Sequence, residues 1–524
     1  MKNTRESFRS SIVLGLSAAL LGLQLFAVQA LAQQATQPAR ANQATAQPAR
    51  FEVVFDAKVS PVPFTGRVYV TLHRNQPRRL PSGPSWNNPD PFFSKDVRDW
   101  KPGTPLVFDD TCLSFPVPLS KVSPGFYYPQ AVMDFGRGDK ISYAAAPGNG
   151  YSRTERLNFK PLEAGAAKLL ITEKYEAEPF RETEHVRLVD IESPLLSKFH
   201  GQSIRHRAAV ILPSSYARDV NRRYPVIYEI PGFGGSVGGA QRIAVDSRTS
   251  VSGVDMLYVV LDPNCYWGHH VFADSANNGP HGQALIDELI PYIEKTFRAE
   301  SVPGARFVTG HSSGGWSSLW LQVRYPDFFG GVWSTAPDPV DFRDFQQINL
   351  YAPGVNMFTD EHGRPRPLAR RGERPTLFYK PFSDMEVVMG HGGQLQSFEA
   401  VFGPRGEDGT PVRLWDRKTG RVDPAIAKSW EPYDIHLRLE RNWSTLGPKL
   451  AGKLHVYMGS LDTYYLDGAT ILLKDSLAKL GSDAMVEIFS GKDHGSLMTP
   501  DLRRRIAKEM ADTYKKLHKT AAAQ

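Results

Sequence analysis

The segment Gly310-His311-Ser312-Ser313-Gly314 has the pattern Gly-x-Ser-x-Gly, in which the serine can act as a nucleophile. A short apolar run, 306–309, precedes it, and a stretch of helical character, 315–325, follows it. A serine hydroxyl attacks a carbonyl carbon only when it is exposed beside a base and beside donors for the developing oxyanion. A sharp turn between a strand and a helix provides that exposure. We therefore predict that Ser312 is the nucleophile of an acyl-transfer reaction.

The base that accepts the serine proton is predicted to be His494. This histidine lies in the sequence 491–495, directly after the last predicted strand, 485–489, and before the C-terminal helical segment. A loop in that place can carry an imidazole over the carboxyl edge of a parallel sheet, where a serine after strand 306–309 also lies. A structural role is the alternative for any single histidine.

An acidic side chain is needed to orient the imidazole and to stabilise its charged form. Asp462 follows the predicted strand 454–458 and is the expected third member. Asp338 and Asp341 follow the preceding strand and are rivals, whereas Asp493 adjoins the histidine and is badly placed to reach its ring. Another rival, Asp467, is expected within a helix.

An oxyanion hole requires two backbone N–H groups that point at one position. We predict the N–H of Ser313, the residue after the nucleophile, and the N–H of Phe233. Phe233 lies in the glycine-rich segment 231–235, which directly follows the predicted strand 226–230. A glycine-rich strand end without a ligand is the alternative. A phosphate-binding loop is not expected, because no Gly-Lys-Ser or Gly-Lys-Thr follows.

The segment 264–282 combines aromatic and polar residues and follows the predicted strand 256–262. We predict that Trp267 and His269 line the substrate site, with the indole ring available for stacking. A metal site is not expected, since the adjacent His269 and His270 are not completed by further ligands at suitable spacing. No cofactor is expected.

The remaining patterns predict a two-part organisation. Residues 51–180 contain short alternating or apolar runs separated by Gly, Pro, Asn and Asp, which is typical of a small all-β, sandwich-like domain. In 181–524, strands alternate with helical segments such as 284–297, which predicts an α/β domain with a mostly parallel sheet. The stretch 339–447 interrupts this alternation. It is either a lid over the site or a surface excursion without a catalytic role, and the sequence favours neither interpretation.

The N-terminal residues 1–32 have the charged start, apolar centre and Ala-Leu-Ala end of a cleavable signal peptide. An uncleaved membrane anchor is the alternative. Residues 33–50, rich in Ala, Gln and Pro, are expected to form a disordered linker. We therefore expect a periplasmic or secreted protein that has no membrane segment after signal removal.

Charge and cysteine content exclude some classes of function. The formal net charge is +7 over 524 residues, and no basic stripe is interleaved with aromatic residues, so a nucleic-acid partner is not expected. The two cysteines, Cys112 and Cys265, are expected to be separate buried thiols, with a disulfide as the alternative. The oligomeric state is not predicted.

Four segments resemble the putative-esterase family, which includes esterase D, enterochelin esterase and bacterial feruloyl esterases; they are 223–228, 288–294, 310–315 and 324–330. The resemblance covers about 205–338 and 450–520. It implies an α/β-hydrolase fold, a metal-independent serine esterase, and triad roles for Ser312, Asp462 and His494. The sequence departs from the family pattern at Pro231, where a histidine is usual, and in the long insertion.

Together these observations predict an exported serine esterase that hydrolyses carboxylic esters, with carbohydrate-linked acyl or feruloyl esters as the expected substrates. A siderophore ester and an acyltransferase reaction at the same site are alternatives. A non-catalytic glycan-binding protein is the alternative of a different class.

Overall fold

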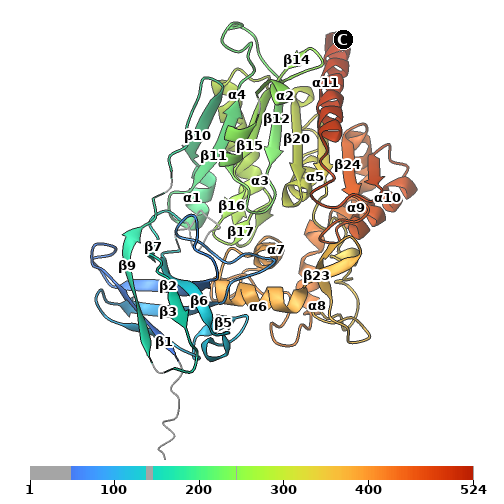
Figure 1. Cartoon of the computed structure of the whole chain (residues 1–524). Coiled ribbons are helices and arrows are strands. Elements are labelled where there is room, and N and C mark those ends of the chain that lie inside the picture. Colours follow the sequence, from blue (N-terminus) through green and yellow to red (C-terminus); the bar gives the residue numbers. More distant parts are fainter. Residues whose placement is uncertain (1–48, 137–145, 164, 177, 244, 523–524) are drawn as a thin grey trace, which may run out of the picture. The chain divides into compact units, whose positions relative to one another are not determined.

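The structure is a computed structural model that describes residues 49–136, 146–163, 165–176, 178–243 and 245–522 (Figure 1). The predicted signal peptide and nearly all of the linker lie outside these residues. The described residues belong to one compact unit, in which the strands form two large sheets and several short hairpins. Within the described ranges, no helix combines the length and the apolar character that a membrane span requires.

The first nine strands pair into one continuous sheet in the order β4-β1-β9-β7-β6-β2-β3-β5, with β8 paired to β6. Their bounds are Arg50–Phe55 (β1), Phe64–His73 (β2), Phe92–Trp100 (β3), Leu106–Phe108 (β4), Leu113–Phe115 (β5), Gly125–Asp134 (β6), Gly150–Ser152 (β7), Leu157–Phe159 (β8) and Ala166–Lys174 (β9). The predicted sandwich of two sheets is thus a single sheet. It still folds back on itself, because the rings of Phe55 on β1 and Trp100 on β3 lie 4.6 Å apart although four strands separate β1 from β3.

The second large sheet has eight strands in the order β10-β11-β15-β12-β20-β21-β24-β25. Their bounds are Val186–Glu192 (β10), Arg205–Ile211 (β11), Val226–Ile230 (β12), Leu257–Leu261 (β15), Arg306–His311 (β20), Gly331–Thr335 (β21), Leu454–Gly459 (β24) and Met485–Phe489 (β25). The sheet is mixed: neighbours are parallel from β15 to β25, whereas β10 and β11 are antiparallel to each other and β11 is antiparallel to β15.

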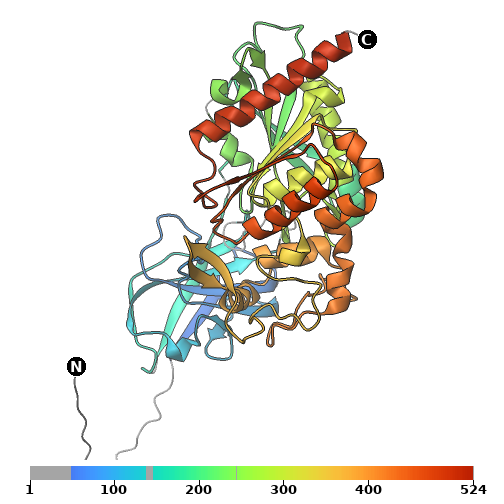
Figure 2. The same ribbon diagram turned by 90° about the vertical axis from the view of Figure 1, so that its right-hand side faces the viewer.

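Both faces of this sheet are buried. Neighbouring residues of a strand point to opposite sides, so each strand supplies residues to both cores. Ile227 and Phe307 belong to the core on the face covered by α11, Pro500–Ala522, which Figure 2 shows running across the sheet. Tyr228 and Val308 belong to the core on the other face, which also contains residues of α4, α5, α9 and α10. Apolar residues on both faces explain why the strands of this sheet read as continuous apolar runs.

The helices have the following bounds: Pro194–His200 (α1), Val245–Thr249 (α2), His281–Ala284 (α3), Ile290–Thr296 (α4), Ser313–Arg324 (α5), Tyr379–Met389 (α6), Gln394–Phe402 (α7), Pro424–Ser429 (α8), Ile435–Leu450 (α9), Asp467–Lys479 (α10) and Pro500–Ala522 (α11). A π-helical turn, Leu285–Leu289, joins α3 to α4, so the helix predicted over 284–297 is present but irregular. The short hairpins are Ser250–Val251 with Val254–Asp255 (β13, β14), Asn264–Cys265 with Gly268–His269 (β16, β17), Asp274–Ser275 with Gly279–Pro280 (β18, β19) and Pro367–Arg371 with Arg374–Phe378 (β22, β23).

The stretch 339–447, between β21 and β24, contains the hairpin β22–β23 and the helices α6, α7 and α8 and most of α9. Asp423 and Asp434 accept hydrogen bonds from the first N–H groups of α8 and α9, respectively, and so fix where these helices begin. This stretch also contacts the first sheet. Arg67 on β2 donates to the carbonyl oxygens of Val387 and Val388, which lie near the end of α6.

Candidate active site

Ser312 lies between β20 and α5 with φ 62° and ψ −126°, a backbone conformation that non-glycine residues rarely adopt. The neighbouring glycines make this turn possible. A Cβ atom on Gly314 would lie 1.9 Å from the carbonyl oxygen of Ile230, and one on Gly310 would lie 2.1 Å from the carbonyl oxygen of Gly314. The Gly-x-Ser-x-Gly spacing is therefore required because strand, turn and helix are packed too closely for any side chain at either glycine.

His494 and Asp462 form a directly bonded pair, with 2.7 Å between Nδ1 of the imidazole and Oδ2 of the carboxylate. Asp462 follows β24 and is completely buried, and its other oxygen accepts a hydrogen bond from the N–H of Tyr464. An ionised carboxylate can only accept, so Nδ1 of His494 carries the proton and Nε2 is left as the basic nitrogen.

The electrostatic surroundings of His494 favour its charged form. Burial lowers the pKa of His494, but the hydrogen bond and the negative charge of Asp462 outweigh burial, so the pKa is raised above its ordinary value. The carboxyl group of Asp338 acts in the same direction. The imidazole is thus a stronger base than a free histidine.

Ser312 and His494 line the same cavity, which has a volume of about 270 Å³. Most of its wall is apolar or aromatic. The lining comprises Trp86, Gly232, Phe233, His311, Ser312, Asp338, Gln346, Leu368, Leu377, Phe382, Gln394, Leu395, Phe398, Tyr464, Leu466 and His494. Seven of these residues lie in the stretch 339–447, so that stretch forms part of the wall beside the serine.

Trp86 is the cavity residue that comes from the N-terminal part of the chain, and the sequence did not single it out. It lies in the loop between β2 and β3, and its ring centroid is 5.3 Å from that of Phe233 and 5.2 Å from that of Phe382. A tryptophan in a loop rich in Gly and Pro is the only sequence signal, because its partners lie far away along the chain.

Asp338, a rival for the acid role, also lines this cavity but is bonded to another residue. Its Oδ2 accepts a hydrogen bond of 2.6 Å from the hydroxyl of Ser313, which in turn accepts one from the side-chain amide of Gln394. Burial raises the pKa of Asp338 to about 6. Asp338 therefore holds the side chain of Ser313.

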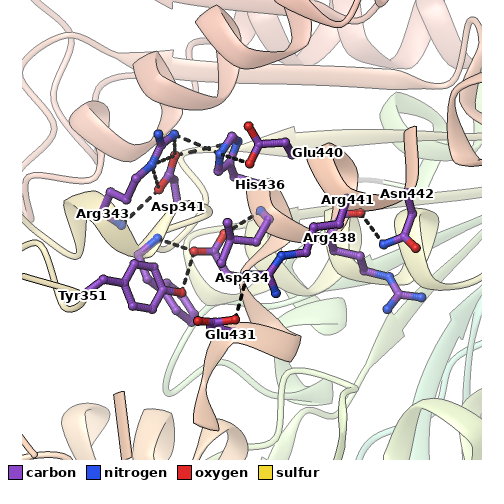
Figure 3. A network of polar contacts seen from close by, with 12 residues as sticks. Asp341, Arg343, Tyr351, Glu431, Asp434, His436, Arg438, Glu440, Arg441 and Asn442 are labelled. Atoms are coloured by element: carbon purple, nitrogen blue, oxygen red, sulfur yellow. Dashed lines mark hydrogen bonds and ion pairs between the residues drawn. The ribbon is translucent and has the colours of Figure 1, made fainter. Parts of the chain in front are cut away.

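The other two rivals in loops have structural partners. Asp341 is completely buried, and its carboxylate pairs with the guanidinium of Arg343, which also donates to Nε2 of His436 (Figure 3). This network fixes the start of the 339–447 stretch against α9. Asp493 accepts a hydrogen bond from the N–H of Ser496 and shapes its own loop.

Two backbone N–H groups lie where an oxyanion hole is expected. A Cβ on Gly232 would be 3.0 Å from the carbonyl oxygen of His311 and 3.2 Å from Cβ of Ser312, so the loop 231–235 passes directly against the serine turn. In the described part of the chain, the N–H groups of Phe233 and Ser313 donate to no protein acceptor. Both are available to a ligand.

His269, which was expected to line the substrate site, instead supports this loop from beneath. It is buried, its Nε2 donates to the carbonyl oxygen of Pro231 over 2.8 Å, and its Nδ1 accepts from the N–H of Val271. Burial lowers the pKa of His269 to about 4, so the ring is neutral. Both ring nitrogens are occupied, and the residue does not line the cavity of Ser312.

Trp267, the other residue expected to line the substrate site, lies elsewhere. It is half-buried and lines a different cavity, which shares no lining residue with that of Ser312. Cys112 and Cys265 are buried free thiols. Among the described residues, no group of three or more His, Cys, Asp or Glu side chains is arranged to hold a metal ion.

Comparisons with solved structures find similar chains that include several esterases, an S-formylglutathione hydrolase and a putative dipeptidyl aminopeptidase IV. A ferulic acid esterase is 13% identical, with 63% of this chain and 99% of that chain covered and a TM-score of 0.39. An S-formylglutathione hydrolase from Agrobacterium tumefaciens is 12% identical, with 63% and 94% covered and a TM-score of 0.36. A ferulic acid esterase from Anaeromyces mucronatus in complex with ferulic acid is 14% identical, with 65% and 95% covered and a TM-score of 0.34.

These TM-scores are too low for the similarity to solved structures to support a fold assignment. The description of the fold rests on the strand order of the second sheet and on the turn at Ser312. The family model described as Putative esterase matches residues 203–441, a range that includes Ser312 and ends before Asp462 and His494. Residues 203–441 therefore match the putative-esterase family, and the match indicates a carboxylic ester hydrolase.

Proposed function

We propose that the protein is an exported serine esterase in which Ser312, His494 and Asp462 form the catalytic triad. One observation carries the proposal: a serine in a strained turn shares a cavity with a buried, carboxylate-bonded histidine. The order of the three residues along the chain, serine then aspartate then histidine, also fits an α/β-hydrolase.

In the first half of the reaction, Oγ of Ser312 attacks the ester carbonyl carbon and its proton passes to Nε2 of His494. The negative charge that develops on the carbonyl oxygen is stabilised by the N–H groups of Phe233 and Ser313. The tetrahedral intermediate then breaks its bond to the alcohol oxygen. The leaving alcohol takes the proton from His494, and the acyl group remains on Ser312.

In the second half, a water molecule gives a proton to His494 and its oxygen attacks the acyl carbon. The bond between that carbon and Oγ of Ser312 breaks, and the proton returns to Oγ. The products are one carboxylic acid and one alcohol. Asp462 keeps its negative charge throughout and stabilises the imidazolium that forms twice in the cycle.

The wall of the cavity supports an apolar or aromatic acyl group as substrate. Trp86, Phe233, Phe382 and Phe398 offer ring faces and edges to such a group. Feruloyl and other aryl acyl esters linked to carbohydrate are therefore the proposed substrates, with the sugar as the leaving alcohol.

A fluorophosphonate probe tests the proposal, because it reacts with activated serines. The wild-type protein is expected to be labelled, Ser312→Ala is expected to remain unlabelled, and Ser301→Ala, which alters an exposed serine, is expected to be labelled like the wild type. A folded wild-type protein that is not labelled would overturn the proposal and favour the non-catalytic glycan-binding alternative. A panel of feruloyl, short acyl and acetyl-sugar esters then measures the acyl preference.

A further inference from the structure

A second cavity, of about 290 Å³, lies beneath the segment 262–281 and shares no lining residue with the cavity of Ser312. Its floor contains polar side chains that are nine-tenths or more buried, among them His270, His281, Asn277 and Asn278. The triad mechanism uses none of these residues. Buried polar side chains around an open cavity are a feature of ligand sites, since burial without a partner is unfavourable.

Two amide atoms of the floor lack a protein partner. Asn277 is fixed because its Nδ2 donates to the carbonyl oxygens of Ala400 and Gly403, which leaves Oδ1 as an unpartnered acceptor. Asn278 Nδ2 is an unpartnered donor, while its Oδ1 contacts the thiol of Cys265. Both atoms have almost no accessible surface, so a small shift of the side chains on binding is needed before the floor offers one acceptor and one donor, a combination that fits hydroxyl groups.

The two histidines of the floor, His270 and His281, are neutral and stacked on each other. Their rings are stacked with centroids 3.7 Å apart, and burial lowers the pKa of each well below its ordinary value. A neutral floor does not attract an anion to the bottom of the cavity. Any preference of the cavity for a charged ligand must therefore come from the side chains at its mouth.

The mouth carries an excess of positive charge, because the lining of the cavity holds three arginines, Arg205, Arg207 and Arg405, against one carboxylate, that of Asp262. Arg205 and Arg207 share one carboxylate, that of Asp190. Arg405 is exposed at the cavity and takes part in no ion pair within the described ranges. An acidic group entering the cavity would meet Arg405 and the incompletely neutralised pair beside it.

An aromatic wall completes the site. Trp267 is half-buried and packs edge to face against Tyr266, whose ring is stacked on His391 at 4.1 Å. This packing fixes the indole in place. Faces of fixed indole rings stack against the apolar faces of sugar rings.

We propose that this cavity is a second binding site that takes one acidic sugar unit, with its hydroxyl groups at Asn277 and Asn278, its ring against Trp267 and its carboxylate at Arg405. The volume suits a single ring rather than an oligosaccharide. The segment 262–281 also contacts the loop 231–235 beside Ser312, since a Cβ on Gly268 would lie 3.3 Å from the ring of Phe233. That the bound sugar belongs to the ester substrate rests on the proposed function, whereas the binding itself does not.

The test is a binding measurement by isothermal titration calorimetry on the full-length Ser312→Ala protein, in which hydrolysis plays no part. The probes are galacturonic acid and galactose, which differ only in the carboxylate. Galacturonic acid is expected to bind more tightly than galactose, and Arg405→Ala is expected to weaken galacturonic acid binding about tenfold. Trp267→Ala is expected to weaken the binding of both sugars. Arg374→Ala, which removes an exposed arginine outside the cavity, is the matched control.

Equal affinity for the two sugars, no binding of either, or unchanged affinity in Arg405→Ala would overturn the proposal. Melting temperatures of all variants show whether each is folded, and Asn278→Asp supplies a second variant that keeps the side-chain size while it places a negative charge in the floor. This variant is expected to disfavour galacturonic acid. Failure of the esterase proposal is visible separately, as absence of fluorophosphonate labelling in a protein that still binds the sugar.

Discussion

The hydroxyl of Ser313 donates a hydrogen bond of 2.6 Å to Oδ2 of Asp338, so the residue after the proposed nucleophile is tied to a buried carboxyl group. This carboxyl group faces the cavity of Ser312 and has a raised pKa of about 6. It therefore holds a proton in the folded protein at a pH where an unfolded aspartate has lost it.

Asp338→Asn is expected to stabilise the protein at pH 8 but not at pH 4. Because the folded pKa of about 6 exceeds the unfolded value of 3.8, stability falls as pH rises from 3.8 through 6. An amide accepts the same hydrogen bond from Ser313 without that penalty, so the free energy of unfolding should rise by up to about 3 kcal/mol at pH 8. Urea unfolding at both pH values measures the effect. The exposed Asp475→Asn is the control, and equal changes at pH 4 and pH 8 would contradict the prediction.

Asp462→Asn is expected to lower kcat/KM for ester hydrolysis by about a thousandfold to ten-thousandfold, since the imidazole loses its orienting charge. In the proposed mechanism His494 must be neutral to accept the serine proton, so kcat/KM is expected to rise with pH through the pKa of His494. That pKa is raised in the wild type, and loss of the Asp462 charge should move the acid limb to lower pH. A pH–rate profile measures both effects. Asp493 raises the pKa of His494 less than Asp462 does, so Asp493→Asn should cost less activity. A larger loss in Asp493→Asn than in Asp462→Asn would show that Asp462 is not the acid of the triad.

Gly314→Ala is expected to destabilise the protein by about 3 kcal/mol or more, because the new methyl group would meet a backbone carbonyl that cannot move aside. That carbonyl, of Ile230, would be 1.9 Å from the added Cβ. Gly239→Ala is the matched control, as nothing lies within 4 Å of a Cβ there. Thermal unfolding compares the two variants, and similar melting temperatures would show that the serine turn tolerates a side chain.

Trp86→Ala is expected to raise KM for feruloyl esters about tenfold while changing KM for acetyl esters little, since only the larger acyl group reaches the lost ring. Initial-rate kinetics on both esters give the ratio. The variant removes a contact to Phe233 as well, so kcat for the acetyl ester serves as the internal control for the integrity of the oxyanion loop. An equal change in KM for both esters would place the acyl group elsewhere in the cavity.

The central strands of the second sheet were predictable because they are short apolar runs buried on both faces. The predicted strands 226–230 and 454–458 match the central strands β12 and β24, and 485–489 coincides with the edge strand β25, which is also mostly apolar. β10 was missed, since it is an edge strand whose residues alternate between polar and apolar. A continuous apolar run therefore reveals a strand more readily than a segment in which polar and apolar residues alternate.

Side-chain placement was less predictable than chain order. His269 has the residue type and strand-end position of a substrate ligand, yet its ring nitrogens are bonded to backbone groups of Pro231 and Val271. Trp86 carries no local sign that it reaches the cavity of Ser312. Both outcomes depend on contacts between segments far apart along the chain, which periodicity does not encode.

Because Trp86 enters the cavity from the loop between β2 and β3, the acyl pocket is incomplete without the N-terminal strands. A fragment that began at residue 203 would keep Ser312, Asp462 and His494 but lose one wall of their cavity. Under the proposed function, the leading β-sheet takes part in substrate selection, and substitutions at the tip of a single loop would change which acids are released while Ser312, Asp462 and His494 stay the same.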